Sequence, residues 1–159
     1  MCGIIGYTNN VSNNQSVIEN MLQKISHRGP DDQGYYQDSK ITLGMRRLSI
    51  IDLDSGNQPL FNEDKSLILV FNGEIYNYQV LRAKLISLGH TFTTNSDSEV
   101  IIHGYEEYGN DIVNHLRGMF AFAIYNIHTK ALFIARDIFG IKPLFLSLIH
   151  ISEPTRQEA

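Results

Sequence analysis

Stretches of strand length that are apolar or rich in aromatic or β-branched residues predict the strands of this chain. They occupy residues 3–7, 34–38, 41–48, 66–71, 90–94, 118–126, 131–136 and 142–145. The polar turn Asp38-Ser39-Lys40 joins the second stretch to the third, and 118–126 forms an apolar hairpin with 131–136. The strands therefore come in adjacent pairs along the chain.

Apolar positions three or four residues apart predict three helices. In chain order these cover Ser16–Ser26, Tyr78–Leu88 and a stretch from Ser96 or Asp97 to about Tyr108. Ser16 and Glu19 have the spacing of a capping box, and Gly89 and Gly109 are placed to end the later helices. Paired strands with helices inserted between the groups predict an α+β fold of stacked layers and argue against a doubly wound parallel sheet.

Composition narrows the class of protein. A chain of 159 residues with 43% hydrophobic and 19% charged residues is typical of one soluble globular domain. A net charge of −4 gives no electrostatic signature for nucleic acid or an anionic membrane, so we expect neither as a partner. A single cysteine, no leader pattern and no apolar run of spanning length predict a cytoplasmic protein in a reducing compartment.

The end of the sequence does not fit the pattern of the rest. Residues 146–151 are apolar, whereas 152–159 are polar and close no helix or strand. We therefore expect a domain over 1–145 that is incomplete at its C-terminal end, followed by a foreign or disordered tail over 146–159.

Cys2 is the only cysteine, and its position is its most informative property. Removal of the initiator methionine would leave a thiol and a free α-amine on one residue. The amine titrates near pH ~8 and can take the thiol proton, which produces the nucleophilic thiolate. The alternative is a small buried side chain on an apolar first strand.

Asn72-Gly73 follows a buried apolar strand. An Asn-Gly pair is typical of a simple turn, and that interpretation stands beside a functional one. A side-chain amide and an adjacent backbone N–H at a strand end can converge on one developing negative oxygen, and glycine permits close approach of a ligand.

Charged residues at two other places are candidates for binding a zwitterion. Arg46 and Arg47 are adjacent on a strand and point to opposite faces, so one of them faces inward and needs an anionic partner. Asp97 lies at a helix start, where it can cap the helix, bind an ammonium group, or do both. A structural pairing of Arg47 with Asp52 or Asp54 is the alternative to a binding role.

The remaining patterns point to no cofactor. The six histidines show no paired metal-ligand spacing, so we assign no metal site. The chain contains neither a GxGxxG motif nor a P-loop, so its sequence shows no nucleotide site.

Eight motifs together resemble the class II glutamine amidotransferase domain of glutamine-hydrolysing asparagine synthetases. They are Met1–Gly6, His27–Asp31, Arg47–Asp52, Gln58–Leu60, Asn72–Asn77, Ser96–Ile101, Gly118–Ala123, and Ala135–Asp137 with Lys142–Leu144. Each motif alone is weak, but their order and spacing match over residues 1–145. The resemblance implies an N-terminal-nucleophile hydrolase, which is a sandwich of two antiparallel sheets between helical layers.

The resemblance also implies the chemistry. Cys2 would attack the side-chain amide of L-glutamine with its own α-amine as general base, and Asn72 and Gly73 would form the oxyanion hole. Ammonia would leave, and water would release glutamate from a γ-glutamyl thioester. Arg47 would bind the substrate α-carboxylate, while Glu74 and Asp97 would hold its α-ammonium group.

The same resemblance places backbone groups of Leu48, Ser49, Ile50 and Ile51 along the pocket. It further implies that this domain works beside an ATP-pyrophosphatase synthetase domain, normally in the same chain, and it allows a homodimer of the full-length enzyme. ATP and magnesium would belong to that synthetase domain, which the present sequence lacks. Two alternatives remain: an amidotransferase for another acceptor acid or a sugar phosphate, and a truncated, catalytically silent fragment.

Overall fold

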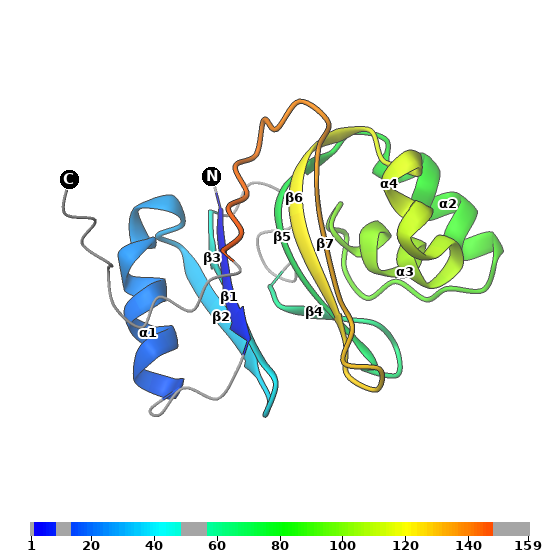
Figure 1. Cartoon of the computed structure of the whole chain (residues 1–159). Helices are drawn as coiled ribbons and strands as arrows, with labels where there is room; N and C mark the ends of the chain where they lie inside the picture. Colours follow the sequence, from blue (N-terminus) through cyan, green and yellow to red (C-terminus); the bar gives the residue numbers. More distant parts are fainter. Residues whose placement is uncertain (1, 9–13, 49–56, 148–159) are drawn as a thin grey trace, which may run out of the picture.

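Two antiparallel sheets packed face to face form the centre of the molecule, and helices cover their outer sides (Figure 1). The computed structural model describes residues 2–8, 14–48 and 57–147. Its layers run from α1 through the first sheet and the second sheet to the helices α2, α3 and α4. The expected α+β class and the sandwich of two antiparallel sheets between helical layers are confirmed.

The first sheet, sheet A, has the strand order β1-β3-β2. Its strands are β1 (Gly3–Thr8), β2 (Asp32–Gln37) and β3 (Ile41–Arg47), and α1 (Asn14–Lys24) lies on its outer face. Ile18 and Leu22 of α1 are buried against this sheet. A Cβ on Gly44 of β3 would lie 3.0 Å from the Ile18 Cδ1 atom, so glycine there lets the helix approach closely.

The second sheet, sheet B, has the order β4-β5-β6-β7. Its strands are β4 (Leu60–Phe61), β5 (Leu67–Ile75), β6 (Gly118–Asn126) and β7 (Leu132–Arg136). Its outer face is covered by three helices, α2 (Tyr78–Ser87), α3 (Glu99–Tyr108) and α4 (Ile112–His115). Short 3₁₀ turns occupy Ser26–Arg28, after α1, and Gly109–Asp111, between α3 and α4.

Alternation along β5 divides the interior into two cores. Leu69 and Phe71 belong to the core between sheet B and the helices, whereas Ile68 and Val70 belong to the core between the two sheets. Continuing this alternation places the side chains of Asn72 and Glu74 on the face that looks toward sheet A. The strand therefore carries polar side chains into the space between the sheets at one end of the sandwich.

Two predicted strands are wrong, and hydrogen bonding explains both. Residues 90–94 form no strand because the backbone N–H groups of Thr93 and Thr94 donate to the Glu99 carboxylate instead of a sheet partner. Residues 142–145 form none either, because the Lys142 N–H donates to Asp137 and Pro143 has no N–H to offer.

The interpretation of Asn72-Gly73 as a simple turn is also wrong. The strand β5 continues to Ile75, and Asn72 and Gly73 pair with Ala121 and Phe120 of β6. Tertiary pairing with the neighbouring strand therefore overrides the local turn preference of the dipeptide.

Both predicted N-terminal helix caps differ from the structure, whereas Gly89 and Gly109 follow the ends of α2 and α3 with positive φ as expected. The first helix begins at Asn14, which places Ser16 inside it and excludes the capping box. The residue before α3 is Ser98, and no side chain caps that helix end. Asp97 instead accepts a hydrogen bond from the Ile75 N–H at 2.7 Å, which ties the loop before α3 to the end of β5.

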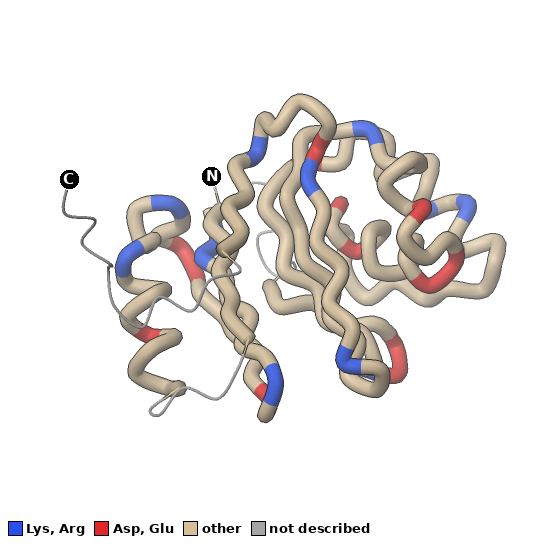
Figure 2. The backbone as a smooth tube through the Cα atoms, viewed as in Figure 1, with Lys and Arg blue, Asp and Glu red and all other residues tan. Residues whose placement is uncertain are grey.

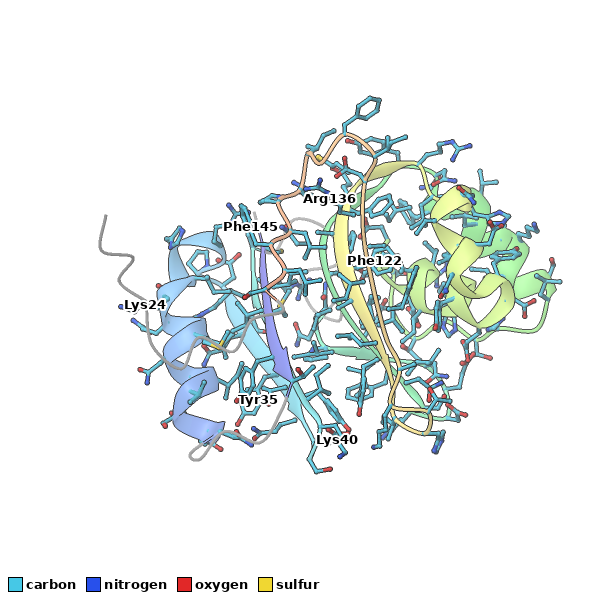
Figure 3. All side chains as sticks on the ribbon, viewed as in Figure 1. Lys24, Tyr35, Lys40, Phe122, Arg136 and Phe145 are labelled. Atoms are coloured by element: carbon cyan, nitrogen blue, oxygen red, sulfur yellow. The ribbon has the colours of Figure 1, made fainter. Side chains whose placement is uncertain are left out.

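After β7 the chain crosses from sheet B toward sheet A, and Phe145 lies on this stretch (Figure 3). Ile138, Phe139 and Phe145 are each at least 85% exposed. Most of the predicted tail over 146–159 lies outside the described residues, so its boundary stays a prediction. Within the described ranges, none of the helices combines the length and apolar character that a membrane span requires.

Candidate active site

A cavity of about 340 Å³ opens between the two sheets, at the end where β3 and β5 carry polar side chains. The structure brings seven of the predicted site residues to its wall: Cys2, Arg47, Leu48, Asn72, Gly73, Glu74 and Asp97. They come from four separate parts of the sequence that only the fold brings together. The other predicted residues, Ser49, Ile50 and Ile51, lie outside the described part of the chain.

Cys2 precedes β1 and is half-buried at the cavity. Its Sγ atom lies 3.4 Å from the Leu48 N–H, which donates to it, and 3.6 Å from the Leu48 carbonyl oxygen, which can accept the thiol proton. The Cys2 carbonyl oxygen accepts from Arg28 at 3.4 Å. These contacts fix the thiol at the cavity wall with a backbone donor in place for a thiolate.

The adjacent arginines of β3 face opposite sides of sheet A, as predicted. Arg46 donates from Nε to the Leu22 carbonyl of α1 at 3.2 Å, on the outer face. Arg47 points between the sheets, is 5% exposed, and donates from Nη1 to the Asn57 Oδ1 atom at 2.7 Å. The buried guanidinium therefore lines the cavity, and it presents a cation in a place shielded from water.

Asn72 and Gly73 are held rigidly because they lie within the central pair of strands of sheet B. Asn72 is buried at 3% exposure and has its side chain on the cavity side. A Cβ on Gly73 would overlap the Met119 carbonyl oxygen of β6. Glycine is therefore required at 73 by the close approach of the neighbouring backbone, independently of any ligand.

Glu74 and Asp97 form the acidic wall of the cavity. Asp97 is 5% exposed, and its Oδ2 atom accepts from the Ile75 N–H. Burial raises the pKa of Asp97 above its ordinary value, and the nearby Glu74 charge raises it further. Two acids that repel each other in this way favour the arrival of a cationic group between them.

The sequence interpretation missed residues that also line the cavity, notably Gln58 and Lys142. Gln58 accepts from the Phe71 N–H through Oε1 at 2.7 Å, so it braces β5 beside Asn72. Lys142 is 4% exposed, and its backbone N–H donates to Asp137. Asp137 also accepts from the backbone of Phe139 and Ile141, and a single buried carboxylate thus shapes the loop that brings Lys142 to the site.

Only one signal in the sequence pointed to these missed residues. Gln58 and Lys142 both fall inside motifs that carry the family resemblance, but no local pattern links either of them to Cys2. Gln58 reaches the site through its contact with β5, and Lys142 through the stretch that follows β7, and spacing along the chain reveals neither arrangement.

The family model and the similar proteins found by comparison agree on one family. The family model described as a glutamine amidotransferase domain matches residues 1–154. Asparagine synthetase [glutamine-hydrolyzing] 1 of Bacillus subtilis is 46% identical over 155 residues, covering 94% of this chain and 24% of that protein. Asparagine synthetase [glutamine-hydrolyzing] 2 of Arabidopsis thaliana is 45% identical over 149 residues, covering 92% and 25%. The chain thus spans about a quarter of the length of these relatives.

Solved structures agree on the fold. A glutamine phosphoribosylpyrophosphate amidotransferase from B. subtilis, complexed with ADP and GMP, superposes with a TM-score of 0.66 at 22% identity. The match covers 86% of this chain and 36% of that one. At this level of identity the likeness concerns the arrangement of the two sheets and their helices.

Proposed function

Because the chain belongs to the glutamine amidotransferase domain family, we propose that it hydrolyses the side-chain amide of L-glutamine to glutamate and ammonia. One observation supports this above the others: a single cavity holds a thiol, a side-chain amide, a buried guanidinium and two carboxylates. Each of these groups answers a requirement of glutamine hydrolysis, namely nucleophile, oxyanion donor, carboxylate binder and ammonium binder.

The reaction would proceed in two halves. After removal of Met1, the α-amine of Cys2 takes the thiol proton, and Sγ attacks the carbon of the substrate amide. Negative charge then develops on the amide oxygen, where the Asn72 side-chain amide and the Gly73 N–H stabilise it. The α-ammonium gives its proton to the leaving nitrogen, so ammonia departs and a γ-glutamyl thioester remains. Water, deprotonated by the same amine, releases glutamate and regenerates the thiol.

The charges of the cavity suit a free amino acid. Arg47 would bind the α-carboxylate, and Glu74 and Asp97 would bind the α-ammonium group, with Arg47 and Asp97 largely shielded from water. Charge-assisted hydrogen bonds of this kind hold the reacting amide at a fixed distance from Cys2.

The ammonia is proposed to serve a synthetase domain, as the names of the relatives suggest, with aspartate as the acceptor. ATP and Mg²⁺ would act in that domain, and glutamine hydrolysis itself would need no cofactor. A cytoplasmic location suits a thiol that has to stay reduced. An acceptor other than aspartate and a silent domain remain the alternatives, and assays of full-length enzyme with different acceptor acids would distinguish them.

Selective labelling of Cys2 tests the proposal directly. We expect iodoacetamide to modify the one thiol of the chain quickly, and L-glutamine to slow the modification because it occupies the cavity. D-glutamine and L-asparagine serve as controls, since one reverses the placement of the α groups and the other shortens the side chain. Equal protection by all three, with no release of glutamate, would contradict a glutamine site.

The raised pKa of Asp97 leads to a pH-dependent affinity for glutamine. As the pH falls through that raised pKa, Asp97 becomes neutral and no longer attracts the α-ammonium group, so KM should rise. Asp97→Asn keeps the oxygen that accepts from the Ile75 N–H but removes the charge. We expect it to raise KM about 10- to 100-fold at neutral pH and to flatten the acid limb of the KM profile.

Measurement of KM for glutamine across the acid range checks this prediction. Asp111→Asn is the matched control, because Asp111 lies at the exposed turn before α4 and should leave the profile unchanged. An unaltered acid limb in Asp97→Asn would assign the titration to another group.

A further inference from the structure

A second group of ionisable side chains lies in the helical layer beside sheet B, apart from the cavity. The His–Glu cluster consists of Glu63, His90, His103 and Glu106, and one ligand atom from each lies within 4.8 Å of every other. Acidic positions are visible in this layer in Figure 2. None of the four residues lines the cavity that holds Cys2.

Three separate segments supply the His–Glu cluster. Glu63 lies in the turn between β4 and β5, His90 follows α2, and His103 and Glu106 lie one turn apart on α3. His103 is 1% exposed and His90 is half-buried with its side chain 12% exposed. The cluster therefore joins a turn, a loop and a helix at a place partly shielded from water.

Both imidazoles turn the same nitrogen toward the centre of the cluster. Nδ1 of His103 lies 2.9 Å from Glu106 and 3.5 Å from Glu63. Nδ1 of His90 lies 3.6 Å from Glu106 and 3.8 Å from Glu63. In a tetrahedral zinc site with nitrogen and oxygen ligands about 2.0–2.2 Å from the metal, neighbouring ligand atoms are about 3.3–3.6 Å apart. The four nitrogen–oxygen distances, from 2.9 to 3.8 Å, lie on both sides of this value, and the remaining pairs of ligand atoms lie within 4.8 Å.

The Nε2 atoms of the two imidazoles, which point away from the centre of the cluster, each face a further carboxylate. Nε2 of His90 lies 2.8 Å from the Glu107 carboxylate, and Nε2 of His103 faces Glu99 at 3.6 Å without a hydrogen bond. A carboxylate behind each imidazole is the usual outer shell of a histidine bound to zinc, because it fixes the ring and its tautomer.

The two glutamate ligands are held from behind as well. Glu63 accepts from the Thr91 N–H at 3.0 Å, and Glu106 accepts from the Asn62 side chain at 2.7 Å. His90, Glu63 and Glu106 are thus each positioned by a hydrogen bond to a residue outside the cluster before any ion arrives.

Charge favours a cation at the same place. Four carboxylates face the two imidazoles, those of Glu63, Glu99, Glu106 and Glu107. The carboxylate of Glu99 accepts hydrogen bonds from the backbone and side chains of Thr93 and Thr94, which stabilise its charged form. Even with both imidazoles protonated, these six groups carry a net negative charge, and a divalent ion would balance it.

We propose that the His–Glu cluster is a structural zinc site that ties the β4–β5 turn and the loop after α2 to α3. Two imidazoles and two carboxylates that converge on one point suit zinc, whereas magnesium and calcium prefer sites made of oxygen alone. The loop it would tie down continues through Thr94, which Glu99 holds, to Asp97 at the cavity.

Metal titration of the 159-residue chain tests the site. The Cys2→Ser background is used, because a free thiol beside an α-amine chelates zinc by itself. After treatment with EDTA, we expect the chain to bind one equivalent of Co²⁺ with the strong visible absorption of four-coordinate cobalt. That spectrum should lack thiolate charge transfer, zinc should displace the cobalt, and zinc should raise the unfolding temperature.

Matched variants locate the binding. His90→Gln, at a half-buried side chain, and Glu63→Gln, at an exposed one, should each weaken zinc binding by at least ~100-fold and abolish the rise in unfolding temperature. Glu107→Ala, behind His90, should weaken it ~10–100-fold. His128→Gln and Glu19→Gln, at exposed positions elsewhere, are the controls.

Three results would overturn the proposal. They are zinc binding that disappears when Cys2 is replaced, equal zinc affinity in His90→Gln and His128→Gln, and a six-coordinate cobalt spectrum that persists in every variant. Measurement of the unfolding temperature without metal separates a lost ligand from a lost fold, because a folded variant retains its cooperative transition.

Discussion

Cys2→Ser is expected to lower glutamine hydrolysis by at least ~10³-fold, the largest loss that any single substitution in this chain should cause. Serine retains the α-amine and can keep the contacts that Sγ makes with the Leu48 N–H and carbonyl oxygen. The hydroxyl, however, ionises far less readily than the thiol, so the amine can no longer generate a competent nucleophile. Release of glutamate, followed over time with saturating glutamine, measures the loss.

Retention of Met1 should cause a comparable loss for a different reason. The amide that would then join Met1 to Cys2 cannot act as a base, although the thiol itself is unchanged. Mass spectrometry establishes which N-terminus each preparation carries, and circular dichroism establishes that Cys2→Ser is folded. Wild-type rates in either form would exclude the N-terminal-nucleophile mechanism.

Short contiguous motifs were enough to predict many of the residues that line the cavity. Cys2, Arg47, Asn72 and Asp97 each lie in a short segment whose residue types indicate one chemical task. The fold adds what spacing cannot show, which is that strand alternation turns Arg47 and Asn72 toward the same space between the sheets. The chemical roles of these residues stay predictions until the variants are measured.

The failed secondary-structure predictions share a physical cause. In residues 90–94 the β-branched threonines favour a strand, yet the Glu99 carboxylate takes the N–H groups of Thr93 and Thr94. At Asn72-Gly73 the opposite occurs, because pairing with β6 extends a strand through a dipeptide that favours turns. In both places a hydrogen-bonding partner overrides the local backbone preference. That partner is Glu99 of the following helix for residues 90–94, and strand β6 for Asn72-Gly73.

The spacing of residues along the sequence could not predict the His–Glu cluster. His90 and His103 belong to different elements, and Glu63 joins them only because the β4–β5 turn packs beside α3. His103 and Glu106 are three residues apart on one helix, a spacing too common to indicate a metal on its own. The expectation that no histidine is a metal ligand rested on pairs of histidines, whereas the cluster mixes histidine with glutamate.

Asn72→Ala is expected to lower kcat for glutamine hydrolysis by about 10²–10³-fold, the cost of removing one donor from an oxyanion hole. The side-chain amide lies on a buried strand within the central pair of sheet B, so it is held in place before the substrate arrives. Its interaction strengthens only as negative charge develops on the substrate oxygen. KM should therefore change far less than kcat.

Steady-state kinetics over a full range of glutamine concentrations separates the two parameters. Asn114→Ala is a matched control, since Asn114 is outside the cavity on α4 and its side chain contacts Asp111. Protection of Cys2 from alkylation by glutamine should survive in Asn72→Ala, because the proposed ground-state binding groups are Arg47, Glu74 and Asp97. A large rise in KM with unchanged kcat would instead place Asn72 among the groups that bind the substrate before reaction.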